Sequence, residues 1–370
     1  MAKKLIIVGG GHASLPVIKM AEKWKRYDLE IILISENPYL IYSGALPQFM
    51  GGFYEWNQTT VNLKKLCERY SVRFVESFVE SISKDQSTVW TTGGERYAYD
   101  YLLINIGAST ADFKDLQNAV PVKPMDELLS LRKNLKRGEI EKLLIAGGGA
   151  AGTELALNLS HPRSFTSTDI TLLENNESLL SSFPAKMSDR VTQILQQRSV
   201  NVQTSKKFQP AMSKEYDAVL IAVGNRPGSL SITHDFETGA GERILTDETL
   251  RVKGEQTVFA AGDTADVNGR DYQAIGVHAV KQGVLLRHNI ESLLTGGKLK
   301  RYKPYAVNPL ILSDGPDNAF YVVNNFAWEG RWAAILKYVL DMNWLEKYSK
   351  KPGYRRSYIE LLRDGVKRSG

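Results

Sequence analysis

Short, continuous apolar runs alternate with stretches of helical spacing in the first part of the chain. Residues 3–8 form such a run, residues 13–26 carry apolar side chains at helical intervals, and residues 29–34 form a second run. A continuous apolar run of this length is typical of a strand that is buried on both faces of a parallel sheet. The three segments together predict a βαβ unit.

The same pattern returns in the middle of the chain. Residues 142–146 form an apolar run, helical spacing follows to about Leu159, and residues 169–173 form the next run. Each half also ends with a similar apolar segment before a glycine, at 100–107 and at 217–224. We interpret this repeat as the duplication of a nucleotide-binding domain, with an α/β fold in both copies.

Shorter strands are predicted between the two copies. Residues 72–75, 88–91 and 101–106 are rich in β-branched and aromatic side chains, and residues 92–94 supply a hairpin turn. The length of 370 residues is consistent with two or three domains.

Composition excludes several classes of protein. With 43% apolar and 24% charged residues, the chain has the composition of a globular protein. No apolar run reaches the length of a membrane span, and the apolar run after Met1 is too short for a signal peptide. We therefore expect a cytoplasmic protein.

The one cysteine, Cys67, cannot form an intrachain disulfide or a redox pair. Its apolar neighbours predict a buried, unreactive thiol. The five histidines show no close spacing, so no metal site is expected. The net charge of +6 is concentrated in residues 331–370, and the rest of the chain is neutral. This distribution does not favour a nucleic-acid partner.

A glycine-rich fingerprint follows the first predicted strand. Gly9 permits a tight turn, Gly11 lets the backbone approach a pyrophosphate, and Ser14 is small enough for close packing of helix and strand. The pyrophosphate would lie at the N-terminus of the following helix. Glu36, after the second strand, is the candidate for binding a ribose, although it comes one residue later than the tightest pattern.

The second fingerprint is complete, with Gly147, Gly149 and Gly152. Glu174 ends the next predicted strand, where a carboxylate accepts hydrogen bonds from the ribose of NAD and repels the 2′-phosphate of NADP. No arginine follows directly. This pattern favours NADH over NADPH.

The chain resembles the FAD-dependent pyridine nucleotide-disulfide oxidoreductase superfamily over nearly its whole length. The resemblance rests on both fingerprints and the two strand–glycine endings, and on residues 246–252 and 258–263. Residues 42–47 and 276–283 are similar to the type II NADH dehydrogenase-like branch, and most similar to the oxidoreductases associated with selenide, water dikinase.

The resemblance implies two Rossmann-like domains, with the FAD domain interrupted by the NAD domain, and a C-terminal α-rich segment. The implied division is a first FAD part (1–121), an NAD(H) domain (122–242), a second FAD part (243–300) and a C-terminal interface or membrane-associated segment (301–370).

Site residues can be transferred position by position from the resemblance. Those expected to bind FAD are Gly9, Gly11, His12, Ser14, Glu36, Ser43, Pro47, Gly107, Gly262, Asp263 and Lys281. Those expected to bind NAD are Gly147, Gly149, Gly152, Glu174 and Gly224.

Two residues are candidates for catalysis. The positive charge of Lys281, with the N-terminus of its helix, would stabilise a reduced flavin. Glu154 would orient the nicotinamide or pass a proton to the acceptor. Because a redox cysteine pair is missing, electrons would pass directly from the flavin to the acceptor.

The C-terminal region carries an apolar stripe at helical spacing, accompanied by basic side chains that begin with Lys337 and Lys347. The stripe consists of Trp332, Ile335, Leu336, Val339, Leu340 and Trp344. Such a helix can lie on a membrane surface, as the C-terminal region does in the type II branch. The alternative is packing on the flavin domain or on the second copy of a homodimer.

Together these features predict an NADH:acceptor oxidoreductase with bound FAD, whose acceptor is a quinone. This function places the protein either in the cytoplasm or on the cytoplasmic face of the membrane. One alternative is a soluble NAD(P)H-dependent reductase of a small acceptor, including a selenium-containing one. Another is a flavin-binding redox sensor with low turnover.

Overall fold

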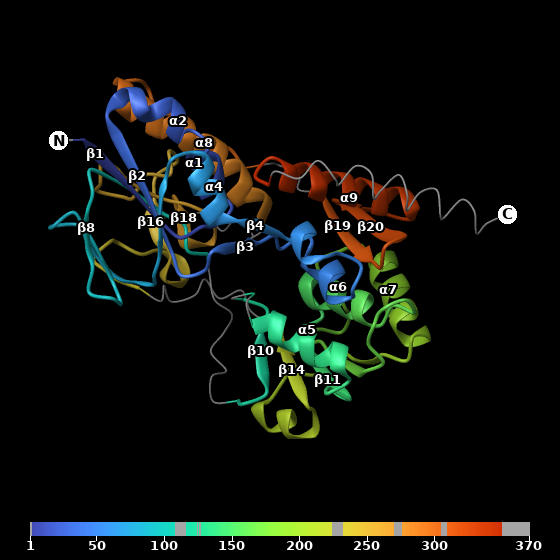
Figure 1. Ribbon diagram of the computed structural model, residues 1–370. Helices are drawn as coiled ribbons and strands as arrows, with labels where there is room; N and C mark the ends of the chain where they lie inside the picture. Colours follow the sequence, from blue (N-terminus) through green and yellow to red (C-terminus); the bar gives the residue numbers. More distant parts are fainter. Residues whose placement is uncertain are drawn as a thin grey trace.

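The structure is a computed structural model that describes residues 2–107, 116–123, 125, 127–223, 232–269, 276–304 and 309–349. Gly224 and the basic side chains from residue 350 onward lie outside the described residues. Figure 1 shows a sheet unit built mainly from the beginning of the chain, a second one built from its middle, and a C-terminal unit beside them.

Five parallel strands form the first sheet. Strand β1 (Lys3–Val8) lies at its centre because its side chains from Leu5 to Val8 are buried on both faces. The order is β17 (Val258–Ala260), β9 (Tyr101–Ile104), β1, β2 (Leu29–Ser35) and β5 (Arg73–Glu76). Strand β17 comes from far along the chain, so the segment between β9 and β17 is inserted into this unit.

The second sheet repeats the first position by position. Its order is β10 (Ala119–Pro121), β14 (Ala218–Ile221), β11 (Lys142–Ala146), β12 (Asp169–Leu173) and β13 (Asn201–Gln203), again all parallel. The repeat seen in the sequence therefore corresponds to two copies of one topology. The exact domain bounds stay a prediction. Strand β10 precedes the predicted boundary at 122 and belongs to this second sheet.

The first unit also contains smaller sheets. They are the sheet of β15 (Thr233–His234), β6 (Val79–Ser83), β7 (Thr88–Thr91) and β8 (Arg96–Ala98), the pair β3 (Tyr39–Ile41) and β4 (Thr60–Asn62), and the pair β16 (Ile244–Thr246) and β18 (Ala265–Val267). The predicted turn at 92–94 connects β7 to β8, which had not been predicted as a strand.

The described helices surround these sheets. They are α1 (Ser14–Ile18), α2 (Ala21–Trp24), α3 (Leu46–Met50), α4 (Leu63–Arg69), α5 (Glu127–Arg137), α6 (Ala150–Leu159), α7 (Ala185–Gln197), α8 (Gly276–Thr295) and α9 (Arg331–Glu346). Helix α8 packs on α1, and α6 packs on α3. Cys67 of α4 is buried as predicted, and burial raises the pKa of its thiol to about 12.

The C-terminal unit combines a sheet with one long helix. Strands β19 (Leu310–Asp314), β20 (Asn318–Val323) and β21 (Phe326–Glu329) form an antiparallel sheet that the sequence analysis did not predict. Helix α9 packs on β20 and β19, and β19 packs on α6 of the second unit (Figure 1). None of the described helices is long and apolar enough to cross a membrane.

Candidate active site

A cavity of about 300 Å³ lies at the carboxyl ends of β1 and β9 in the first unit. It brings together most of the residues predicted to bind FAD, although they come from segments far apart in the chain. The predicted residues that line it are Gly9, Gly11, His12, Glu36, Ser43, Gly107, Gly262 and Asp263. Ligands of open α/β sheets bind at this edge.

The first fingerprint forms the floor of this cavity. Gly9 has a φ of +91°, a conformation in which side chains are strained, and a Cβ there would lie 2.4 Å from the carbonyl oxygen of Asn105. A Cβ on Gly11 would lie 2.3 Å from the side-chain oxygen of Asn105. The proximity of Asn105 therefore requires glycine at both positions.

Asn105 is a site residue that the sequence analysis missed. Its Oδ1 accepts from the Ala13 amide at 3.1 Å and from the Ser14 hydroxyl at 3.3 Å, and its Nδ2 donates to the Ala261 carbonyl at 2.8 Å. It thereby connects the fingerprint, β9 and the segment before Gly262. One feature of the sequence could have identified it: Asn105 places a side-chain amide within the otherwise apolar run at 101–106.

The segment around Asp263 is held from two sides. The amide of Gly262 donates to Gln282 Oε1 of α8 at 2.7 Å. The hydroxyl of Thr264 accepts from the amides of Ile106 and Gly107. Asp263 then faces the cavity, where its Oδ2 lies 2.7 Å from Lys123 Nζ. This carboxylate is placed to accept hydrogen bonds from a ligand hydroxyl group.

His12 offers the observation that fits a bound cofactor best. Burial lowers the pKa of its imidazole to about 4, so the ring is neutral at pH 7. Its Nε2 is buried and has no hydrogen-bond partner among the described residues. A buried polar atom without a partner is costly. A polar group of FAD in this cavity would give His12 that partner.

Two residues expected at the flavin do not line either cavity. Ser14 is buried in α1, where its hydroxyl donates to the Gly9 carbonyl at 2.8 Å. This contact joins helix to strand, as the small third residue was predicted to do. Pro47 lies in the first turn of α3 and is buried there. A direct contact of either residue with the cofactor stays a prediction.

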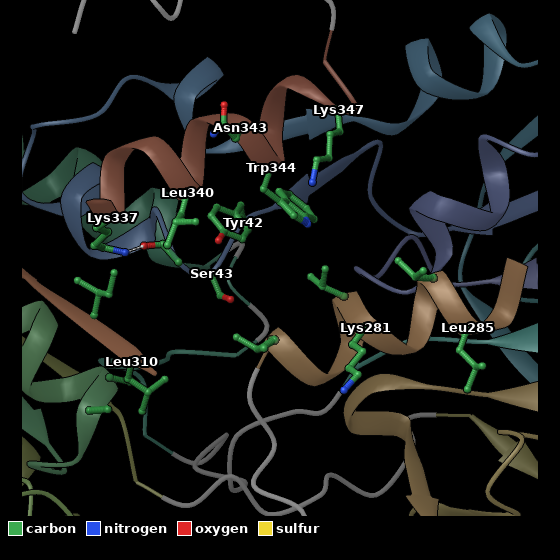
Figure 2. A pocket seen from close by; sticks show the side chains of 18 of the residues that line it. Tyr42, Ser43, Lys281, Leu285, Leu310, Lys337, Leu340, Asn343, Trp344 and Lys347 are labelled. Carbon is green, nitrogen blue, oxygen red and sulfur yellow. Dashed lines mark hydrogen bonds between the residues drawn. The ribbon is translucent and has the colours of Figure 1, made fainter. Parts of the chain in front are cut away.

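A larger cavity of about 1650 Å³ adjoins the first, and Ser43, Lys123 and Gly276 line both. Three further predicted residues line the larger cavity, namely Gly149, Glu154 and Lys281. Figure 2 shows Lys281 on α8 opposite the cavity-facing residues of α9, with Tyr42 and Ser43 between the two helices.

The second fingerprint borders the larger cavity at the start of α6. Gly147 has a φ of +113°, and a Cβ on Gly152 would lie 1.9 Å from the Gly147 carbonyl oxygen, so both glycines serve the turn and the packing of α6. A Cβ on Gly149 would meet no atom within 4 Å. The open space at Gly149 and the free amides at the start of α6 fit the pyrophosphate of NAD(H).

Glu174 ends β12 beside this turn but does not line either cavity. Its Oε2 accepts from the Gly148 amide at 2.8 Å, and its Oε1 accepts from the amide and the side chain of Asn176 at 2.8 Å. The carboxylate therefore fixes the fingerprint turn. A carboxylate has about four acceptor positions, so a ribose hydroxyl can still donate to Glu174, as predicted for NADH.

Glu154 projects from α6 to the wall of the larger cavity. Its Oε1 accepts from the amide and the hydroxyl of Ser313, each at 2.7 Å, and lies 3.8 Å from Lys337 Nζ. Burial raises the pKa of Glu154, and Lys337 and Ser313 offset only part of that effect. A buried carboxyl with a raised pKa beside a cavity is placed to hold a proton and to pass it to a bound ligand.

Lys337 is turned inward, which corrects the expectation that it accompanies the apolar stripe as a basic surface residue. Its Nζ donates to the Gly44 carbonyl and lies 3.2 Å from Asp341 Oδ2. Burial alone would lower the pKa of Lys337, but Asp341 and Glu154 outweigh burial and raise it. The two carboxylates explain why a charged lysine is stable inside the protein.

The apolar stripe is divided by the fold. Trp344 is buried and stacks on Tyr42, with ring centroids 4.4 Å apart. Trp332, Leu336, Val339 and Leu340 are exposed, and Leu340 also lines the larger cavity. The cavity wall therefore combines the aromatic pair with apolar side chains of α8 and α9, which suits a planar, apolar ligand.

The sequence pattern of the pyridine nucleotide-disulphide oxidoreductase family matches residues 3–283, and the chain belongs to this family. The protein is accordingly an FAD-dependent NAD(P)H oxidoreductase. The predicted α/β fold, the class of enzyme and the cofactors FAD and NADH are thereby confirmed.

Individual relatives are distant but extend over most of the chain. A probable NADH dehydrogenase of Dictyostelium discoideum is 22% identical over 99% of this chain and 89% of its own length. The type II NADH:quinone oxidoreductase of Staphylococcus saprophyticus is 22% identical over 92% of this chain and 94% of its own length. These relatives confirm the resemblance to the type II branch.

Solved structures agree on the fold. NDH2 of Plasmodium falciparum, in complex with NADH, has a TM-score of 0.72 at 14% identity and covers 93% of this chain and 95% of its own. The sulfide:quinone oxidoreductase of Aquifex aeolicus has a TM-score of 0.69 at 17% identity and covers 97% of this chain and 95% of its own. None of these comparisons tests the narrower likeness to oxidoreductases associated with selenide, water dikinase.

Proposed function

We propose that this protein oxidises NADH and passes the electrons through FAD to a quinone in the larger cavity. The observation that carries the proposal is that the two cavities adjoin and share the lining residues Ser43, Lys123 and Gly276. A dinucleotide held by the first fingerprint would extend its ring system toward the start of α8. Gly149 of the second fingerprint also lines the larger cavity.

The residues of the chain would bind, orient and shield the reactants. Asp263 and His12 would hold FAD, which supplies two-electron chemistry when bound. Lys281 lines the cavity in the second turn of α8, where its charge and the helix N-terminus favour negative charge on the ring. Gly149 and Glu174 would hold NADH. Glu154 would deliver a proton to the acceptor.

Three reasons favour a quinone as the electron acceptor in the larger cavity. The wall offers the stacked pair Tyr42 and Trp344 and the apolar side chain of Leu340. The chain has one cysteine, so a dithiol relay is excluded. The staphylococcal relative is a type II NADH:quinone oxidoreductase, and the same acceptor here is consistent with that likeness.

We place the protein at the cytoplasmic face of a membrane through the exposed side of α9. Trp332, Leu336, Val339 and Leu340 are 69%, 40%, 39% and 52% exposed and share one face of the helix. Because Leu340 also borders the cavity, a lipid-soluble acceptor could enter from this side. A homodimer that covers the same face is the alternative.

Steady-state kinetics with the purified holoenzyme test this proposal. NADH oxidation should depend on added menadione, and NADPH should support a lower kcat/KM than NADH. If oxygen alone supports the full rate and quinones add nothing, the acceptor is not a quinone. Turnover of selenium compounds but not of quinones would instead favour the soluble reductase.

A further inference from the structure

Asp341 adds a second carboxylate to the Lys337–Glu154 pair. Its Oδ2 lies 3.2 Å from Lys337 Nζ, one helical turn away on α9, and its side chain is 5% exposed. The hydroxyl of Tyr42 faces the same carboxylate and lowers its pKa. Asp341 itself does not line the cavity, whereas Tyr42, Lys337 and Glu154 do.

The charges in this buried cluster do not balance. Lys337 brings one positive charge, and Glu154 and Asp341 bring two negative charges when both are ionised. An unbalanced charge is costly at this depth, and one proton on the carboxylate pair removes it. Two carboxylates that share one cation therefore titrate as a unit that retains a proton more firmly than either carboxylate would in water.

We propose that Asp341 is a positioning residue that keeps one proton on the Glu154–Asp341 pair, so that Glu154 can donate it to the acceptor. Lys337 and Tyr42 transmit the effect of Asp341 to the cavity. The inference rests on the proposed function, because it names the proton source for the reduction of a quinone-type acceptor.

The stoichiometry of the reaction requires one such proton. NADH, one proton and a quinone give NAD⁺ and a quinol. The hydride of NADH accounts for two electrons and one hydrogen, and the second hydrogen must come from elsewhere. At the cavity wall the O–H bond of the Glu154 carboxyl breaks as an O–H bond forms on the quinone oxygen. The pair then regains a proton from solvent.

The groups that face Asp341 come from each element packed around it. They are Lys337 of α9, Tyr42 after β3, Tyr54 after α3 and Glu154 of α6. Burial raises the pKa of Asp341, while Lys337 and Tyr42 lower it in part. Burial likewise raises the pKa of Glu154, and Asp341 raises it further. The tyrosines stay neutral because burial raises the pKa of both.

Replacement of Asp341 by asparagine should change the pH profile of kcat in a definite direction. Without the Asp341 charge, Glu154 pairs one-to-one with Lys337, and the pKa of Glu154 falls. The charges of Glu154 and Lys337 then balance without an added proton, so Glu154 has none to give. The pH profile of kcat for quinone reduction should therefore shift to lower pH, and on the high-pH side kcat should fall by about 100-fold or more, which is the size expected for loss of a general acid.

Controls separate this role from a structural one. Asp341→Glu should restore the wild-type pH profile, and Asp317→Asn, on the exposed turn between β19 and β20, should leave it unchanged. Tyr42→Phe keeps the ring but removes the hydroxyl that lowers the pKa of Asp341, so the proton moves to Asp341 and the profile shifts in the same direction. A uniform loss of kcat at every pH in Asp341→Asn would overturn the proposal, as would an unchanged profile.

A second measurement does not depend on turnover. Infrared difference spectra of the resting holoenzyme should show the C=O band of a protonated carboxyl group at neutral pH, and this band should be missing in both Asp341→Asn and Glu154→Gln. Persistence of the band in both variants would overturn the proposal. If wild-type protein shows the band but reduces no quinone, the proposed function fails and the proton-holding cluster stands.

Discussion

Asn105 and Lys337 show what single residues contribute to this site. Asn105 joins three chain segments at the floor of the smaller cavity through hydrogen bonds to Ala13, Ser14 and Ala261. Lys337 joins α9 to α6 and to the Gly44 carbonyl. Both side chains are buried. Their burial is tolerated because the Asn105 amide and the Lys337 ammonium bind polar groups from distant segments.

Asp263 is the residue on which retention of FAD should depend most. Asp263→Ala removes a carboxylate that faces the cavity and binds Lys123 at 2.7 Å. Loss of a charge-assisted hydrogen bond of about 1.5–3 kcal/mol corresponds to roughly a 10- to 100-fold weaker affinity. Flavin absorbance relative to protein absorbance after gel filtration measures the occupancy.

The matched control is Asp317→Ala, which removes an exposed carboxylate from the turn between β19 and β20. This control should keep the wild-type occupancy. Full flavin occupancy in Asp263→Ala would show that the Gly262–Asp263 pair does not hold the cofactor.

Residue identities in the fingerprints could be predicted because their physics is local. Gly9 and Gly147 have positive φ angles in tight turns, and such turns leave a pattern in consecutive residues. The partners of Glu154 could not be predicted in the same way. Ser313 and Lys337 lie far along the chain, and only the fold brings them within reach of α6.

At the scale of elements, α9 has two different faces. Its buried face carries Lys337, Asp341 and Trp344, and its exposed face carries Trp332 and Leu340. The helical spacing in the sequence predicted one apolar stripe. It could not reveal which members pack inside, because the sheet of β19–β21 that supports the helix was itself not predicted. Those strands are short, and their apolar runs fit helix or strand equally well.

The exposed face of α9 gives a prediction about membrane binding. The double substitution Leu336→Asp and Val339→Asp places two charges on this face and should abolish cosedimentation with anionic liposomes, because burial of an ionised carboxylate in the interface is costly. Turnover with a water-soluble quinone should stay near the wild-type value.

The matched control is Lys64→Asp on α4, which adds negative charge elsewhere on the surface. If liposome binding is unchanged in the α9 variant, or if analytical ultracentrifugation shows a dimer that the same variant dissociates, the face is an interface between copies of the chain.

At the scale of the whole molecule, two copies of one parallel sheet and a C-terminal unit meet around two adjoining cavities. The α/β class followed from strands whose apolar runs are buried on both faces, and the interrupted order was implied by the resemblance to the family. The larger cavity did not, because its walls come from α6, α8, α9 and the segment after β3. The shape of the larger cavity depends on how the units pack against each other, and no local sequence pattern predicts that packing.

The central claim is that NADH reduces a bound flavin and that a quinone then takes the electrons. Anaerobic stopped-flow absorbance spectroscopy of the purified holoenzyme tests it most directly. Addition of NADH should bleach the oxidised flavin spectrum within seconds, and subsequent addition of menadione should restore it without oxygen. A flavin that NADH does not bleach, or that quinones leave reduced, would contradict the account.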